Sequence, residues 1–242
     1  SDVCSSDLEN GYLALSWPKE VGGAGLTPLE SVIVAEEFAK AGAPTGGPND
    51  GFGITMLGNT MLRWGTDEQK RHFLPRVLSG EDRWCQGYSE PAAGSDLGNL
   101  GCRAVLDGDE WVINGQKIYT SLASYADYIW LAARTDPDAP KHRGITMFLV
   151  PTTDPGYSYS KIHTMVNAST FNTFYDDVRV PDSAILGELH GGWGLIINQL
   201  NYERVGLAPP GMIERTYEDT LEWARTTTLP DGRRVIDQEW VQ

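Results

Sequence analysis

The alternation of hydrophobic and polar residues changes character twice along the chain. Residues 11–80 carry apolar side chains at helical spacing, whereas residues 84–181 form short runs rich in aromatic and β-branched residues. Helical spacing then returns. The pattern predicts an α+β fold with three parts: an N-terminal helical domain over residues 1–80, a central β domain, barrel or sandwich, over 81–184, and the start of a C-terminal helical domain over 185–242.

Capping signals place the first predicted helices. Thr27 and Glu30 have the spacing of a capping box, and Gly42 follows the last residue of the pattern. A glycine-rich connector at residues 18–25 precedes this helix. A second apolar pattern over residues 52–64 predicts another helix.

Proline marks two further boundaries. Thr66 caps a short helix that we expect to end at Leu74-Pro75, because proline disfavours helical geometry in the preceding residue. Gly192 opens a later amphipathic run, which Pro209-Pro210 must interrupt. Residues 239–242 read as part of a continuing helix.

The central region reads as a series of short strands. Residues 103–106 and 111–113 flank an Asp-Gly-Asp turn, which is the signal of a β-hairpin. Further alternating or fully apolar runs predict strands at residues 84–89, 128–133, 145–150, 157–162 and 171–180.

Composition excludes several classes of function. The net charge of −14 argues against binding to nucleic acid or to an anionic membrane, and no apolar run reaches membrane-spanning length. The cysteines Cys4, Cys85 and Cys102 form no CxxC pair, so we expect no disulfide and a cytoplasmic location. The four histidines are scattered, which predicts no metal site.

The stretch from Trp84 to Asp96 carries the most informative chemistry. An apolar and small-polar strand ends near Pro91, and the next residues, Ala92 to Ser95, are small enough for a ligand to approach the backbone. Such a turn can present N–H groups and a hydroxyl to an anion. The residues alone slightly favour an ordinary strand that ends in a loop, because short Gly/Ser motifs often match by chance.

Three landmarks in the same order resemble the flavin-dependent acyl-CoA dehydrogenases. The first is Ser89-Glu-Pro91 followed by Gly94-Ser-Asp96, and the second is Asn114-Gly-Gln-Lys117 followed by Tyr119-Thr-Ser121. The third is Gly191-Gly-Trp193 leading to Leu200-Asn-Tyr-Glu-Arg204. The resemblance covers roughly residues 11–242.

The resemblance implies FAD as cofactor and dehydrogenation of an acyl-CoA to the trans-2-enoyl-CoA, with electrons passed to an electron-transfer flavoprotein. It further implies a role in β-oxidation of fatty acids or steroid side chains, and a homo- or hetero-oligomer, dimeric or tetrameric. By position in the landmarks, the residues implied to contact the flavin are Gln86, Tyr88, Ser89, Gly94, Ser95, Tyr119, Thr120 and Ser121.

The reaction also needs a base that removes the proton next to the thioester, and a carboxylate in a water-poor site serves this purpose. In a subset of the family this glutamate lies in the Leu-x-x-Glu-Arg segment, where this chain has Glu203. Arg204, Asn201 and Ser95 occupy positions implied to contact the acyl-CoA. The alternative for Glu203 is an ordinary ion pair on a helix surface.

Other functions remain open on the sequence alone. An acyl-CoA oxidase or a flavin monooxygenase could share this fold, and so could a non-catalytic partner subunit of a heteromeric dehydrogenase. Members of the family run well beyond residue 242, and residues 1–9 lack periodicity, so we expect a truncated product whose first residues are foreign to the family.

Overall fold

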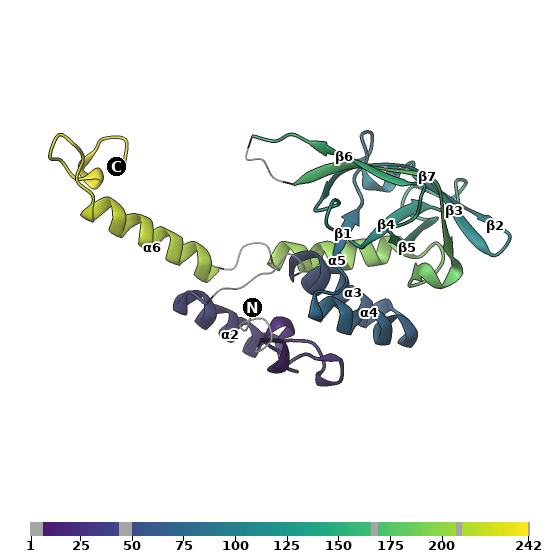
Figure 1. The fold of residues 1–242 in the computed structure, drawn as a ribbon, viewed down its shortest axis with the longest axis horizontal. Coiled ribbons are helices and arrows are strands. Elements are labelled where there is room, and N and C mark those ends of the chain that lie inside the picture. The colour runs from purple at the N-terminus through teal and green to yellow at the C-terminus, as the bar shows by residue number, and fades with distance from the viewer. Residues whose placement is uncertain (1–6, 44–49, 166–168, 207–209, 242) are drawn as a thin grey trace. The chain divides into compact units, whose positions relative to one another are not determined.

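The computed structural model describes residues 7–43, 50–165, 169–206 and 210–241, and it confirms the expected order of helices, β domain and helices (Figure 1). The chain divides into two compact units. The first consists of residues 1–25 and 46–203, and the second consists of residues 26–45 and 204–242. The predicted contacts of the flavin and the candidate base all lie in the first unit.

The helices of the first unit pack against one face of the β domain. They are η1 (Tyr12–Ala14), η2 (Lys19–Val21), η3 (Asp50–Gly58), α3 (Asn59–Trp64), α4 (Asp67–Ser79) and, after the sheet, most of α5 (Gly192–Gly206). The element η3 is a π-helix, where an ordinary helix was predicted. An apolar spacing of three or four residues does not distinguish the two forms.

The prediction that Pro75 ends its helix is wrong, because α4 continues through it to Ser79. A proline inside a helix removes the hydrogen bond to the carbonyl four residues earlier, here that of Arg71. Both Arg71 and Pro75 are exposed, so water replaces the missing donor. The predicted capping box of Thr66 and Gln69 is present, and Gly80 caps the other end.

The β domain is one eight-stranded sheet in the order β6-β7-β3-β2-β4-β5-β8, with β1 paired to β4. The predicted strands are present within a few residues, and β3 continues beyond its hairpin to Ser121. The short strand β8 was not predicted. The bounds are β1 (Trp84–Gly87), β2 (Arg103–Asp107), β3 (Glu110–Ser121), β4 (Tyr128–Arg134), β5 (Ile145–Pro151), β6 (Tyr157–Ile162), β7 (Thr170–Pro181) and β8 (Ile185–Leu186).

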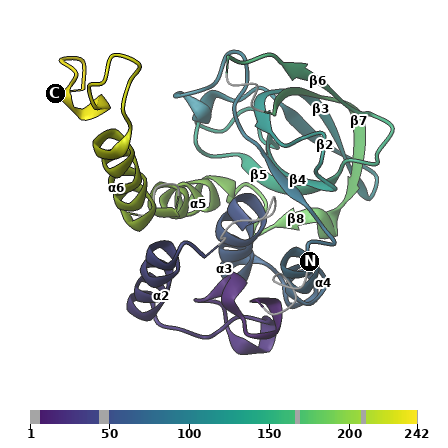
Figure 2. The same ribbon diagram turned by 60° about the vertical axis from the view of Figure 1, so that its left-hand side comes forward.

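Two hydrophobic cores lie on opposite faces of the central strands. On β4, Trp130 and Ala132 face a core shared with η3, α3, α4 and α5, whereas Ile129 and Leu131 face a core formed within the β domain. Strands buried on both faces need mostly apolar residues, which explains the nearly continuous apolar runs in β4 and β5, where Thr146 is the exception in β5. Figure 2 shows α3, α4 and α5 beside this sheet.

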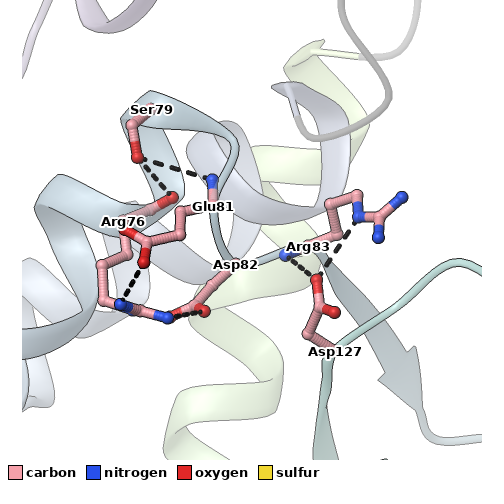
Figure 3. Close-up of polar contacts among 6 residues, drawn as sticks. All are labelled: Arg76, Ser79, Glu81, Asp82, Arg83 and Asp127. Atoms are coloured by element: carbon pink, nitrogen blue, oxygen red, sulfur yellow. Dashed lines mark hydrogen bonds and ion pairs between the residues drawn. The ribbon is translucent and has the colours of Figure 1, made fainter.

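A cluster of ion pairs connects α4 to the first strand (Figure 3). The guanidinium of Arg76 donates to both carboxylate oxygens of Asp82, at 2.6 and 2.7 Å, and to Glu81 at 2.6 Å. Next to it, the backbone N–H of Arg83 donates to Asp127 at 2.8 Å. Because Asp82 is buried, this cluster fixes the direction in which the chain enters β1.

The second unit contains α2 (Pro28–Ala41), α6 (Pro210–Thr226) and η6 (Val235–Asp237). The capping box of Thr27 and Glu30 is present as predicted, and Gly42 caps the helix in the left-handed conformation. The expected interruption at Pro209 lies outside the described residues, and α6 begins at Pro210. The predicted helix at residues 239–242 is wrong, because its described part forms turns.

The sequence predicts no membrane-spanning helix, no metal site and no disulfide, and the described part of the chain bears on each. No helix there is long and apolar enough to cross a bilayer. No cluster of three or more His, Cys, Asp or Glu side chains there could hold a metal ion. Cys85 and Cys102 are buried free thiols, and Cys4 lies outside the described residues.

Candidate active site

The first two sequence landmarks meet at the end of β1. The carbonyl of Ser89 accepts a hydrogen bond of 2.8 Å from the backbone N–H of Ile118 in β3. Residues 86–89 and 119–121, which are separated by a hairpin in the sequence, therefore lie side by side. This is the arrangement that a single ligand touching both segments requires.

A bulge in β3 turns Tyr119 outward. The pairing of β3 with β7 shifts between Lys117 and Thr120, and Tyr119 in between has a φ of 59°. A tyrosine in the left-handed region is uncommon, and bulges of this kind re-aim side chains next to functional sites. The ring of Tyr119 is 66% exposed. An exposed aromatic ring held by strained backbone fits a stacking surface.

The hydroxyl side chains near the bulge differ in their exposure to solvent. Thr120 is buried, and its hydroxyl lies 3.2 Å from that of Thr173, so a contact of Thr120 with a ligand would come from its backbone. Ser121 and Ser89 are half-buried. Neither hydroxyl has a hydrogen-bond partner among the residues that the structure describes.

An ion pair that the sequence analysis missed holds the first landmark in place. The ammonium of Lys117, fully buried, donates to Glu90 Oε1 at 2.7 Å and to the carbonyl of Tyr88 at 3.0 Å. The same carboxylate accepts from the backbone N–H groups of Gly101 and Cys102, at 2.6 and 2.9 Å. Both ionised groups thus have several hydrogen bonds, as buried charges require.

Gly94 and Ser95 lie on an exposed turn that follows Glu90 of this ion pair. Glu90 and Ala93 exchange two backbone hydrogen bonds, of 3.0 and 3.1 Å, which close the turn. Both Gly94 and Ser95 are exposed, and a side chain added at Gly94 would meet only open space. The predicted access to the backbone is therefore present.

The candidate base lies on α5, facing the first strand. Glu203 Oε2 is buried and has no hydrogen-bond partner among the described residues. The phenol of Tyr88, the residue directly after β1, interacts electrostatically with it: burial raises the pKa of Tyr88 well above the usual value, and the charge of Glu203 raises it further. The third landmark thus meets the first. Among the described residues, Glu203 forms no ion pair of the kind that the alternative interpretation expected.

Gln86 points toward α5 as well. Its amide nitrogen donates to Gln199 Oε1 at 2.8 Å, and Gln199 is 1% exposed. Gln199 was missed by the sequence analysis. The signal was available, because it lies three and four residues after Ile196 and Leu195 on the buried face of the helix. A polar residue on that face indicates a buried hydrogen bond.

The other predicted contacts of the substrate lie at the surface. Asn201 and Arg204 flank Glu203 on α5, and both are exposed. A separate cavity of about 390 Å³ opens beside Tyr157 and Tyr159 on β6, and no predicted site residue lines it. The candidate site is therefore defined here by the side chains that converge on it.

These residues fit a flavin. An isoalloxazine ring needs an aromatic or apolar face and hydrogen-bonding groups at its polar edge, and its pyrophosphate needs accessible backbone. Tyr119 offers the exposed ring, and the hydroxyls of Ser89 and Ser121 have no hydrogen-bond partner among residues 7–43, 50–165, 169–206 and 210–241. The open turn at Gly94 and Ser95 offers accessible backbone.

Comparison with known proteins identifies the family. Models of the N-terminal, middle and C-terminal domains of acyl-CoA dehydrogenases match residues 5–81, 85–178 and 190–242. The acyl-CoA dehydrogenase FadE26 of Mycobacterium tuberculosis is 49% identical over 236 residues, which are 96% of this chain and 58% of that protein.

Solved structures give the same result. The ChsE4-ChsE5 complex from Mycobacterium tuberculosis aligns with a TM-score of 0.82 at 48% identity, over 100% of this chain and 62% of that one. The Tcur3481-Tcur3483 steroid ACAD aligns with a TM-score of 0.84 at 45% identity, over 99% and 60%. The chain spans about three fifths of the length of these relatives. It belongs to the acyl-CoA dehydrogenase family.

Proposed function

We propose that the protein is an FAD-dependent dehydrogenase that converts an acyl-CoA thioester to the trans-2-enoyl-CoA and passes the electrons to an electron-transfer flavoprotein. One observation carries this proposal beyond family membership. Glu203 Oε2 is buried and has no hydrogen-bond partner in the part of the chain that the structure describes. Because buried polar atoms are nearly always hydrogen-bonded, such an exception fits a group whose partner is the substrate.

The reaction removes a proton from the α-carbon of the thioester and a hydride from the β-carbon. Glu203 would accept the proton, and bound FAD would supply the acceptor for the hydride. A carboxylate acts as a base at this carbon only if donors polarise the thioester carbonyl. The hydroxyls and backbone N–H groups around Ser89, Ser95 and Ser121 would hold the flavin and the thioester, and Tyr119 would pack on the ring.

We propose further that the acyl group is bulky and that a second subunit takes part. Two aligned structures support this: one is described as a steroid ACAD and the other as a complex of two proteins. Arg204 and Asn201, which are exposed on α5, would contact the CoA portion.

Anaerobic reduction of the purified full-length protein tests the function. The account predicts a yellow protein whose flavin absorbance bleaches on addition of a steroid-type acyl-CoA and recovers slowly in air. Rapid recovery in air would identify an oxidase or monooxygenase instead. A colourless protein that binds flavin only with a sister chain would identify a non-catalytic subunit.

A further inference from the structure

A hydrogen bond between two glutamine side chains joins β1 to α5. Gln86 Nε2 donates to Gln199 Oε1 at 2.8 Å, across 113 residues of sequence. The amide nitrogen of Gln199 in turn lies 2.8 Å from the sulfur of Met56 on η3, a weak acceptor. Three elements of the first unit therefore meet at Gln199.

Little water can reach the Gln199 end of this bond, whereas Gln86 is half-buried. Gln199 is 1% exposed, and with Tyr88 and Trp130 it lines a pocket that has no room for a water molecule. A buried amide that loses its partner costs far more than the hydrogen bond contributes, because its desolvation is no longer compensated. The pair therefore tolerates only one position of α5 along β1.

That position determines where Glu203 lies. Side chains two residues apart share a face of a strand and side chains four residues apart share a face of a helix, and both steps are about 6 to 7 Å. Tyr88 follows Gln86 by two residues, directly after β1, and lies in the same core as Trp84 of that strand. Glu203 follows Gln199 by four residues. The influence of the Glu203 charge on Tyr88 agrees with this register.

We propose that Gln86 and Gln199 are a positioning pair, which fixes α5 on β1 so that Glu203 reaches the substrate. This assigns Gln86 a role different from lining the flavin edge. The inference rests on the proposed function of Glu203 as the base. Neither glutamine would touch the reacting atoms.

Methionine substitutions test the pair, since methionine keeps the length of glutamine without its amide. Three variants of the full-length flavin-loaded protein are compared: Gln86→Met, Gln199→Met and the double variant. Each single change is expected to slow bleaching at saturating acyl-CoA at least about tenfold, because small displacements of a reacting group are costly. The affinities for flavin and for acyl-CoA are expected to stay within about twofold. The double variant is expected to be no slower than the slower single variant.

Gln69→Met is the control. Gln69 is also buried and donates to two backbone carbonyls, of Ser183 and Ile185, but it lies on α4. This variant is expected to lower the unfolding temperature without slowing bleaching. The proposal would be overturned if Gln86→Met lost its flavin while Gln199→Met kept it. It would also be overturned if the effects of the two substitutions on the bleaching rate multiplied in the double variant.

Thermal unfolding of the same variants without flavin separates this proposal from the proposed function. The destabilisation of the double variant is expected to be smaller than the sum of the two single effects. If the destabilisation is less than additive but acyl-CoA does not bleach the flavin of the wild type, the proposed function fails. The structural coupling of Gln86 and Gln199 is then still supported. Additive destabilisation would refute the pair itself.

Discussion

Lys117 shows how one buried charge organises the loop predicted to hold the flavin. Its ammonium contacts the side chain of Glu90 and the backbone of Tyr88, so it fixes the chain on both sides of Ser89. Its place in the Asn-Gly-Gln-Lys landmark could be read from the sequence, but its partner could not. Which acid a lysine meets depends on strand pairing, and here that pairing brings β3 beside the end of β1.

Lys117→Met is therefore expected to destabilise the protein by about 3 to 5 kcal/mol, because it leaves the buried carboxylate of Glu90 without its cation. Denaturant unfolding measures this change. Lys141→Met is the matched control, since Lys141 pairs with Asp96 in an exposed ion pair and its loss is expected to change stability little. Equal effects of the two variants would show that the buried pair does not stabilise the turn.

Cys102 gives a prediction about alkaline pH. Burial raises the pKa of its thiol from 9.0 to about 11. Because the folded state holds this proton more tightly than the unfolded state, the contribution is present below pH 9 and is lost as pH rises to about 11. The expected loss is about 2 to 3 kcal/mol. Between these pH values, the free energy of unfolding should fall less steeply with pH in Cys102→Ala than in the wild type. An unchanged slope would contradict the raised pKa of Cys102.

At the scale of elements, the junction between α4 and β1 sets the start of the strand that carries the first landmark. Asp82 is buried, and both of its oxygens accept from Arg76, whereas Glu81 contacts the same arginine from an exposed position (Figure 3). Asp82→Asn is expected to lower the unfolding temperature by several degrees, because an amide cannot accept at both atoms. Glu81→Gln is expected to leave it almost unchanged. A larger decrease of the unfolding temperature in Glu81→Gln than in Asp82→Asn would contradict this role of the junction.

Local signals predicted where most elements begin and end, since caps depend on residues only three or four positions apart. The two capping boxes, at Thr27 and Thr66, are examples. The π-helix η3 and the bulge at Tyr119 could not be predicted in this way. Both result from packing against distant elements. Pro75 was misjudged for another reason, because a proline is tolerated inside α4 where Arg71 and Pro75 are exposed.

At the scale of the whole molecule, the order of helical and β segments followed from periodicity, but the pairing of strands did not. β1 lies parallel to β4, and α5 returns after more than a hundred residues to pack on the same core. These long-range contacts bring Gln86, Tyr88 and Glu203 together. The family resemblance supplied the roles of the residues, whereas the neighbours of each residue required the structure.

The central claim is that Glu203 is the base acting beside a flavin bound at β1 and β3. The most direct measurement is anaerobic bleaching of the flavin-loaded protein by acyl-CoA in the wild type and in Glu203→Gln. We expect the variant to keep its flavin and to bind acyl-CoA, but to lose bleaching at least a thousandfold, in the upper range for removal of an acid–base group (about 10²–10⁴). Bleaching at the wild-type rate in Glu203→Gln would show that the base lies elsewhere.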